Sequence, residues 1–121
     1  MENETTVNHE EIIIRIVTEN WRLMKLFIKV ITKLDATETT RYLNQVRYFQ
    51  KTINDSLNEA GMKLVNLEGQ LFDIGMAANP LNIDEFNTDD ILIVSQMIEP
   101  LIMKDGIIRK QAIINLAKVE Q

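Results

Sequence analysis

The single histidine is the first place to look for chemistry in this chain, because imidazole serves as a metal ligand and as a general base. That residue, His9, is followed directly by Glu10. A zinc protease would need a second histidine four residues after the first on one helix face, but Ile13 occupies that position. One histidine cannot assemble a usual zinc site, so we expect His9 to be a structural residue of a helix cap.

A second group of candidates is acidic: Asp84, Glu85, Asp89 and Asp90 lie within one short segment. Paired carboxylates can act on a glycosidic bond, and carboxylates spaced around a glycine can bind calcium. This segment lacks the spacing and the glycine of a calcium loop. The chain also has no glycine-rich phosphate loop, serine elbow or dinucleotide fingerprint. We therefore expect a protein that is not an enzyme and needs no metal or cofactor.

The composition favours protein partners over other classes. Of the 121 residues, 45% are hydrophobic and 26% are charged, which is ordinary for a folded globular protein. A net charge of -5 argues against a general nucleic-acid binder. No apolar run is long enough to cross a membrane, and the absence of cysteine suits a reducing compartment. These features predict a soluble, cytoplasmic protein-binding module.

Glycine and proline divide the chain into two halves. The first 60 residues contain neither, whereas all four glycines and both prolines occur from Gly61 onward. Long helices tolerate neither residue well, and turns use both. We therefore predict an α+β fold, in which residues 1–60 form long helices of a dimeric coiled coil or bundle. Residues 61–121 should form a small, all-β, partner-binding domain.

The first predicted helix carries a wide apolar stripe. It should begin at Asn8, whose side chain can cap the backbone of Glu11. Apolar residues then recur at spacings of four and three, with one polar interruption at Asn20. Further apolar residues widen the stripe, so this helix must bury more than one side, against a partner chain or against the second helix of its own chain. The residues predicted at a dimer interface are Ile13, Val17, Met24, Phe27 and Ile31.

Basic residues lie on the side of this helix away from the apolar stripe. They can form a stripe that docks an acidic partner surface, or a solvated face, which is the usual role of such a run. The residues are Arg15, Arg22, Lys25, Lys29 and Lys33.

A second helix is predicted over residues 37–60. Its apolar residues recur at helical spacing, and Gly61 stands where a left-handed residue commonly ends a helix. The junction at residues 35–38 offers capping oxygens but no glycine or proline. It can therefore be a tight turn or a kink.

After Gly61 the apolar pattern becomes that of strands. Strand-like runs cover residues 62–67, 71–73 and 91–99, with a turn at 68–70 and a loop over 75–90 that can hold a helical turn at 83–86. Pro100 interrupts the third run. The clearest local signal is Asp105-Gly106 between two apolar runs, which favours a two-residue hairpin turn. A final strand should end at about Lys118.

The order of these elements, with several short motifs, resembles the GrpE-type nucleotide exchange factors of DnaK-like chaperones. In that family a helix ends in glycine and is followed by a short strand, a glycine turn and a Phe-Asp-Pro element. Next come a strand reading roughly Met-Gln-Lys-Gly-Tyr, a hairpin, Ile-Arg-Pro-Ala, and a strand ending in Ala-Lys. The resemblance covers about half of the chain and rests on residues 57–62, Gly69, Phe72-Asp73, Met97, residues 104–106, Ile108-Arg109 and Ala117-Lys118.

The chain departs from the family pattern at several positions. Ile74 replaces the proline after Phe-Asp, Pro100-Leu101 stands where Gly-Tyr is usual, and Gly106 stands where arginine is frequent. Residues 110–112 replace Pro-Ala, and the N-terminal helical arm is short. These changes are compatible with the fold and bear on the identity of the partner.

The resemblance implies a homodimer whose helices pair and whose β domains project as wings. One wing would hold open the nucleotide cleft of a DnaK-type ATPase domain, so that ADP leaves faster; the mechanism requires no acid, base or metal. By the same resemblance, the partner-binding residues would be Met97, Arg109, Phe72 and Asp73. Met97 can instead be a core residue of the sheet, and Arg109 a surface strand residue. The competing hypothesis is a non-catalytic dimeric adaptor or scaffold that binds a different protein.

Overall fold

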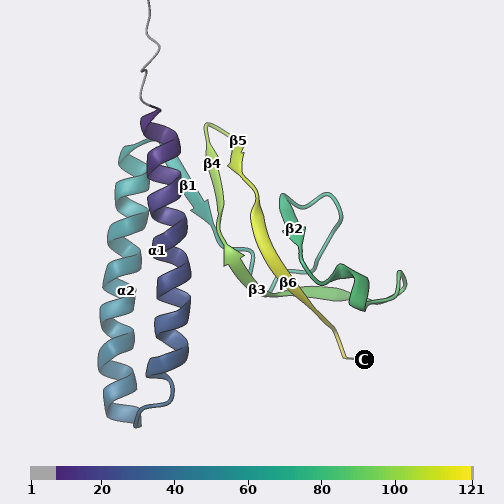
Figure 1. The fold of residues 1–121 in the computed structure, drawn as a ribbon, viewed down its shortest axis with the longest axis horizontal. Helices are drawn as coiled ribbons and strands as arrows, with labels where there is room; N and C mark the ends of the chain where they lie inside the picture. The colour runs from purple at the N-terminus through teal and green to yellow at the C-terminus, as the bar shows by residue number, and fades with distance from the viewer. Residues whose placement is uncertain (1–7, 121) are drawn as a thin grey trace, which may run out of the picture.

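Two helices and a group of strands lie side by side in this protein. The computed structural model describes residues 8–120, which form two α-helices, a short 3-10 helix and six strands. Helices α1 (His9–Ile31) and α2 (Ala36–Glu59) form an antiparallel hairpin, and the strands project from one side of it (Figure 1). The order of helices and strands confirms the predicted α+β class. No helix within the described residues is long and apolar enough to cross a membrane.

Both helices begin at side-chain caps. The Oδ1 atom of Asn8 accepts a hydrogen bond from the backbone N–H of Glu11 at 3.0 Å, as predicted. The Oδ1 atom of Asp35 accepts from the N–H of Glu38 at 2.9 Å, so the junction is a tight turn between two helices and not a kink. At the end of α2, Gly61 has a φ of +76°, the left-handed conformation that the sequence predicts.

The first sheet is antiparallel and lies beside the N-terminal part of α1 (Figure 1). Its order is β1 (Met62–Val65), β4 (Leu101–Lys104) and β5 (Ile107–Lys110). The turn between β4 and β5 has φ values of +54° at Asp105 and +75° at Gly106. Two successive positive φ values are those of a two-residue hairpin turn, so the predicted hairpin is confirmed.

The second sheet contains the two longest strands. Its order is β2 (Ala78–Pro80), β6 (Ala112–Lys118) and β3 (Leu92–Glu99), with β2 parallel and β3 antiparallel to β6. The chain passes from β3 to β4 through Pro100 and from β5 to β6 through Gln111, so two nearly continuous strands run through both sheets (Figure 1).

The segment between β1 and β3 differs in part from the prediction. A 3-10 helix, η1 (Ile83–Glu85), lies where a helical turn was predicted. Strand β2 was not predicted, and residues 71–73 form a single isolated bridge, between Leu71 and Ile93, instead of a strand. These pairings join residues distant in sequence, which a local pattern does not reveal.

Two clusters of buried hydrophobic residues, a larger and a smaller one, join the helices to the strands. Trp21 and Met24 of α1 are buried among residues of the second sheet, and Val17 packs with Leu57 of α2 and Ile102 of β4. The end of α2 agrees with the predicted boundary between residues 60 and 61. Because both clusters cross this boundary, the helices and the strands form one packed unit.

Candidate protein-binding surfaces

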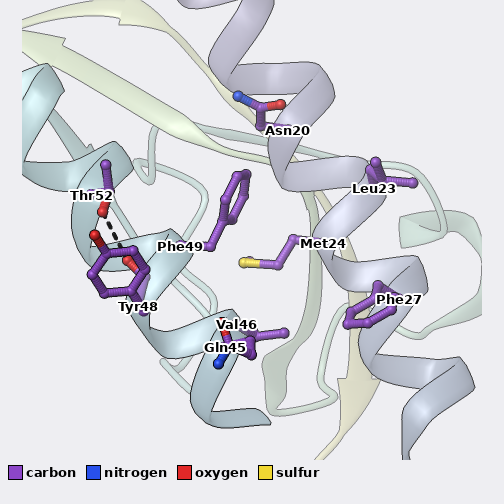
Figure 2. A pocket seen from close by; sticks show the side chains of 9 residues that line it. All are labelled: Asn20, Leu23, Met24, Phe27, Gln45, Val46, Tyr48, Phe49 and Thr52. Atoms are coloured by element: carbon purple, nitrogen blue, oxygen red, sulfur yellow. Dashed lines mark hydrogen bonds between the residues drawn. The ribbon is translucent and has the colours of Figure 1, made fainter. Parts of the chain in front are cut away.

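A groove runs between α1 and α2. Figure 2 shows Met24 of α1 and Phe49 of α2 pointing toward one another across it. The groove has a volume of about 500 Å³, and none of its nine lining residues is charged. Leu23 and Tyr48 are 66% and 71% exposed, which leaves apolar surface in contact with water. The groove is therefore a candidate site for apolar side chains of a partner. It is lined by Asn20, Leu23, Met24, Phe27, Gln45, Val46, Tyr48, Phe49 and Thr52.

The apolar residues of α1 form two stripes that are one residue apart. The inner stripe is buried in the chain and consists of Val17, Trp21, Met24 and Ile31. The outer stripe is exposed and follows the spacing of four and three, apart from one step of seven residues between Ile16 and Leu23. It consists of Ile12, Ile16, Leu23, Phe27 and Val30. The outer stripe is the apolar side of α1 that the packing of one chain leaves uncovered.

The five predicted dimer-interface residues lie in different environments. Val17 and Ile31 are buried within one chain, so their assignment to a dimer interface is corrected in favour of the intramolecular alternative. Met24 is also mostly buried within the chain, but it lines the groove between α1 and α2. Ile13 is half-buried beside the smaller core cluster. Phe27 belongs to the outer stripe and is 41% exposed. Of the five predicted dimer-interface residues, Phe27 is the one best placed to meet a second chain.

Met97 is a core residue, and its assignment to a partner contact is corrected. Its side chain is fully buried, so the alternative of a core residue in the sheet describes it. Its backbone is held by two side chains, because no strand within residues 8–120 pairs with this part of β3 on that edge. The N–H of Met97 donates to Oε2 of Glu68 at 2.8 Å, and its carbonyl oxygen accepts from Nε1 of Trp21 at 2.7 Å.

Ion pairs connect α1 to the strands and their loops (residues 62–118, called the strand unit below) near Met97. Lys25 Nζ lies 2.7 Å from Oε2 of Glu68, and Arg22 Nη1 lies 3.0 Å from Oε2 of Glu99. Glu99 also accepts from Lys110 at 2.8 Å, and this hydrogen bond is the main reason why the pKa of Glu99 is lowered. The Arg22 side chain is 51% exposed, as the solvated-face alternative expects, whereas Lys25 is half-buried; both pair with acidic residues of their own chain.

Arg109 lies on the strand unit close to the start of α1. Its Nε atom lies 3.4 Å from Oε2 of Glu10, and Lys104 Nζ lies 3.1 Å from Oε1 of the same carboxylate. On the same edge strand, β5, Ile107 and Ile108 are 56% and 45% exposed. The β4–β5 hairpin therefore presents two apolar side chains beside a cation.

Phe72 and Asp73 lie at another part of the strand unit. Both line a cavity of about 740 Å³ between residues 71–74 and the segment 83–92. Arg109 is paired with α1 and Met97 is in the core, so the structure does not bring the four predicted partner-binding residues together. Sequence reasoning missed the exposed residues Ile107 and Ile108, although the polar turn beside them marks a surface hairpin.

No group of three histidine or acidic side chains within residues 8–120 is arranged to hold a metal ion. Comparisons of the chain with models of protein families, with curated proteins and with solved structures find no match.

Proposed function

We propose that this chain is a co-chaperone, which binds the ATPase domain of a DnaK-type chaperone through its strand unit and promotes the release of ADP. The observation that carries the proposal is that buried contacts and ion pairs attach the strand unit to the helical hairpin. The order of the helices and strands also resembles that of the exchange factors. A binding wing held at a defined angle is what such a mechanism needs.

Rigidity matters because an exchange factor works by population shift. It changes the balance between a closed and an open nucleotide cleft only as far as it binds the open state more tightly. A wing on a flexible joint would adapt to both states and discriminate poorly. Here the buried Trp21–Met97 hydrogen bond and the Lys25–Glu68 ion pair fix the angle between α1 and β3. Glu10 holds the β4–β5 hairpin against the start of α1.

The β4–β5 hairpin is the contact surface that we propose. Ile107 and Ile108 supply exposed apolar area, and Arg109 supplies a charged group at its edge. Interfaces commonly combine an apolar centre with a polar rim in which arginine is enriched. Ile108-Arg109 is also the pair that matches the family motif. This surface replaces Met97, whose side chain a partner cannot reach.

We further propose that two copies of the chain pair through the outer stripe and the groove. A contact between identical faces must be self-complementary, and an uncharged apolar face meets this condition without placing like charges together. Two helical hairpins that pack in this way form a four-helix bundle, which buries the apolar face that a single hairpin exposes. The strand units would then project outward from the bundle.

The decisive experiment measures the release of a fluorescent ADP analogue from the ATPase domain of a DnaK-type chaperone of the same cell. The wild-type chain should accelerate release at least ~10-fold, which corresponds to ~1.4 kcal/mol of differential binding to the transition state. Ile108→Ser should reduce this acceleration, because it removes apolar contact area. Lys51→Ala is the matched control, since Lys51 lies on the exposed side of α2 and pairs there with Asp55.

Circular dichroism must first show that Ile108→Ser and Lys51→Ala fold like the wild type. A chain that leaves the release rate unchanged contradicts the proposal. Equal acceleration by Ile108→Ser and by the wild type contradicts the assigned surface.

A second candidate function is a dimeric adaptor or scaffold that binds a different protein. One observation favours it: Arg109 is already paired with Glu10 of its own chain, so a residue that matches the family motif is partly engaged. An adaptor would form the same dimer but would not bind the chaperone. Co-purification of a DnaK-type protein in a complex that ATP releases would favour the exchange factor, and a dimer without this complex would favour the adaptor.

A further inference from the structure

The cavity that contains Phe72 and Asp73 has an apolar and strongly exposed lining. Leu71 is 66% exposed, Ile74 is 94% exposed and Ile91 is 50% exposed. Single exposed apolar residues are common on protein surfaces, but these three lie around one cavity together with Ile83. Its volume of about 740 Å³ falls within the usual range of ligand sites. Ile74 makes almost no contact with its own chain, so folding does not explain an isoleucine there.

The walls of this cavity are held in place by hydrogen bonds to the second sheet. The side chain of Asn82 makes two hydrogen bonds with the backbone of Leu116, donating to its carbonyl oxygen at 3.0 Å and accepting from its N–H at 2.9 Å. Asp90 accepts from the N–H of Asn87 at 2.9 Å and pairs with Lys118 at 3.4 Å. A site whose walls are already ordered loses little conformational entropy when it binds a ligand.

The charged residues that line the cavity are all acidic, although the charge of Asp90 is offset by its ion pair with Lys118. Asp73, Asp84 and Asp90 are among its lining residues, and no lysine or arginine of the described part of the chain lines it. The pKa of Asp90 is lowered, chiefly by the backbone hydrogen bond from Asn87, so this carboxyl group is charged at neutral pH. Carboxylates around an apolar floor attract a ligand that combines aliphatic side chains with cationic ones.

We propose that this cavity is a docking site for a short peptide segment of a partner protein, rich in aliphatic and basic residues. Aliphatic side chains would cover Leu71, Ile74 and Ile91, and lysine or arginine side chains would pair with Asp73 and Asp84. The proposal goes beyond nucleotide exchange and does not depend on it, because the site lies apart from the β4–β5 hairpin.

The same charges disfavour other occupants. A second copy of the chain placed symmetrically on this cavity would bring two sets of carboxylates together. Anionic lipid headgroups and nucleic acid phosphates would be repelled for the same reason. A basic, apolar peptide is the partner whose chemistry complements both features of the site.

The test uses the full chain and fluorescein-labelled nonapeptides, with binding measured by fluorescence anisotropy. The first peptide alternates leucine with arginine; the second has serine in place of leucine, and the third has glutamate in place of arginine. The first should bind saturably, and the other two should bind at least ~10-fold more weakly, because each loses one of the two complementary features. No saturable binding of the first peptide below ~1 mM would overturn the proposal.

Variants then locate the site. Ile74→Ser and Asp84→Asn should each weaken binding of the first peptide about fivefold or more, because the first removes an exposed apolar side chain of the lining and the second removes a carboxylate. Leu26→Ser on α1 and Asp55→Asn on α2 are matched controls, with an aliphatic-to-serine and a carboxylate-to-amide change at exposed positions outside the cavity. They should bind like the wild type. An equal loss in the controls, or binding of phosphatidylcholine vesicles that Ile74→Ser abolishes, would overturn the proposal.

Discussion

Glu68 is the residue at which the attachment of α1 to the strand unit can be tested most directly. Its carboxylate accepts from the N–H of Met97 at 2.8 Å and from Lys25 Nζ at 2.9 and 2.7 Å. In Glu68→Ala, the N–H of Met97 loses its partner beside the core, which costs ~1–3 kcal/mol. The lost ion pair adds ~0.5–1 kcal/mol, because both side chains are 24% exposed and solvent screens them in part. We expect a total destabilisation of ~1.5–4 kcal/mol, a large part of the stability of a small protein.

Two further variants separate the hydrogen bond from the ion pair. Glu68→Gln retains an oxygen that can accept from Met97 and loses the charge, so it should cost ~1 kcal/mol or less. Lys25→Met removes the cation and keeps most of the aliphatic stem. A double-mutant cycle between Glu68→Gln and Lys25→Met should give a coupling free energy of ~0.5–1 kcal/mol, the range expected for a partly exposed pair.

Urea denaturation followed by tryptophan fluorescence measures these differences. Trp21 is the single tryptophan of the chain, and Lys25 Nζ lies 5.5 Å from the centroid of its ring, so the probe reports on the junction itself. Far-UV circular dichroism supplies the second probe that a two-state analysis needs. The reasoning is refuted if Glu68→Ala unfolds within ~0.5 kcal/mol of the wild type, or if Glu68→Gln costs as much as Glu68→Ala.

Three other predictions follow from single contacts. Gly106→Val should lower stability by about 1 kcal/mol or more because φ is +75° there, whereas Asp105→Asn should be tolerated; an unchanged Tm for Gly106→Val would contradict this. The lowered pKa of Glu99 means that its contribution to stability is present above the ordinary glutamate pKa of about 4.3 and is lost as pH falls through the folded value. Glu99→Gln should therefore flatten the dependence of Tm on pH below about 4.3, and an unaltered slope would contradict the Lys110–Glu99 contact. Leu23→Asp should give a folded monomer by light scattering, because Leu23 is 66% exposed in one chain; a wild type that is already a monomer of 14.0 kDa would refute the dimer.

Features set by neighbouring residues were predictable from the sequence. The cap at Asn8, the left-handed Gly61 and the turn at Asp105-Gly106 each depend on the preferences of a few adjacent residues. Features set by distant pairing were not predictable. Strand β2 (Ala78–Pro80) has three residues, one of them a proline, and is defined by its pairing with β6, more than 30 residues further along the chain.

The candidate site was predicted less well than the fold, because exposure depends on packing. The resemblance placed Met97 at a partner contact, but its side chain is fully buried in the core. The alternation of Leu92 and Val94 predicts an inward face. It does not fix the position of Met97, since irregular pairing with β6 shifts the register between Val94 and Gln96.

Which of the two apolar stripes of α1 is buried also depends on packing, and here one residue, Trp21, gives a clear physical signal. Adjacent residues on a helix are about 100° apart, so Phe27 and Ile28 can face different partners although both are apolar. Trp21 decides which stripe is the inner one, because a buried indole N–H needs an acceptor and finds it in the carbonyl oxygen of Met97. This bond directs the inner stripe to the strand unit. The outer stripe is thereby left exposed, which is why the dimer proposed here forms through Leu23, Phe27 and the groove that they line.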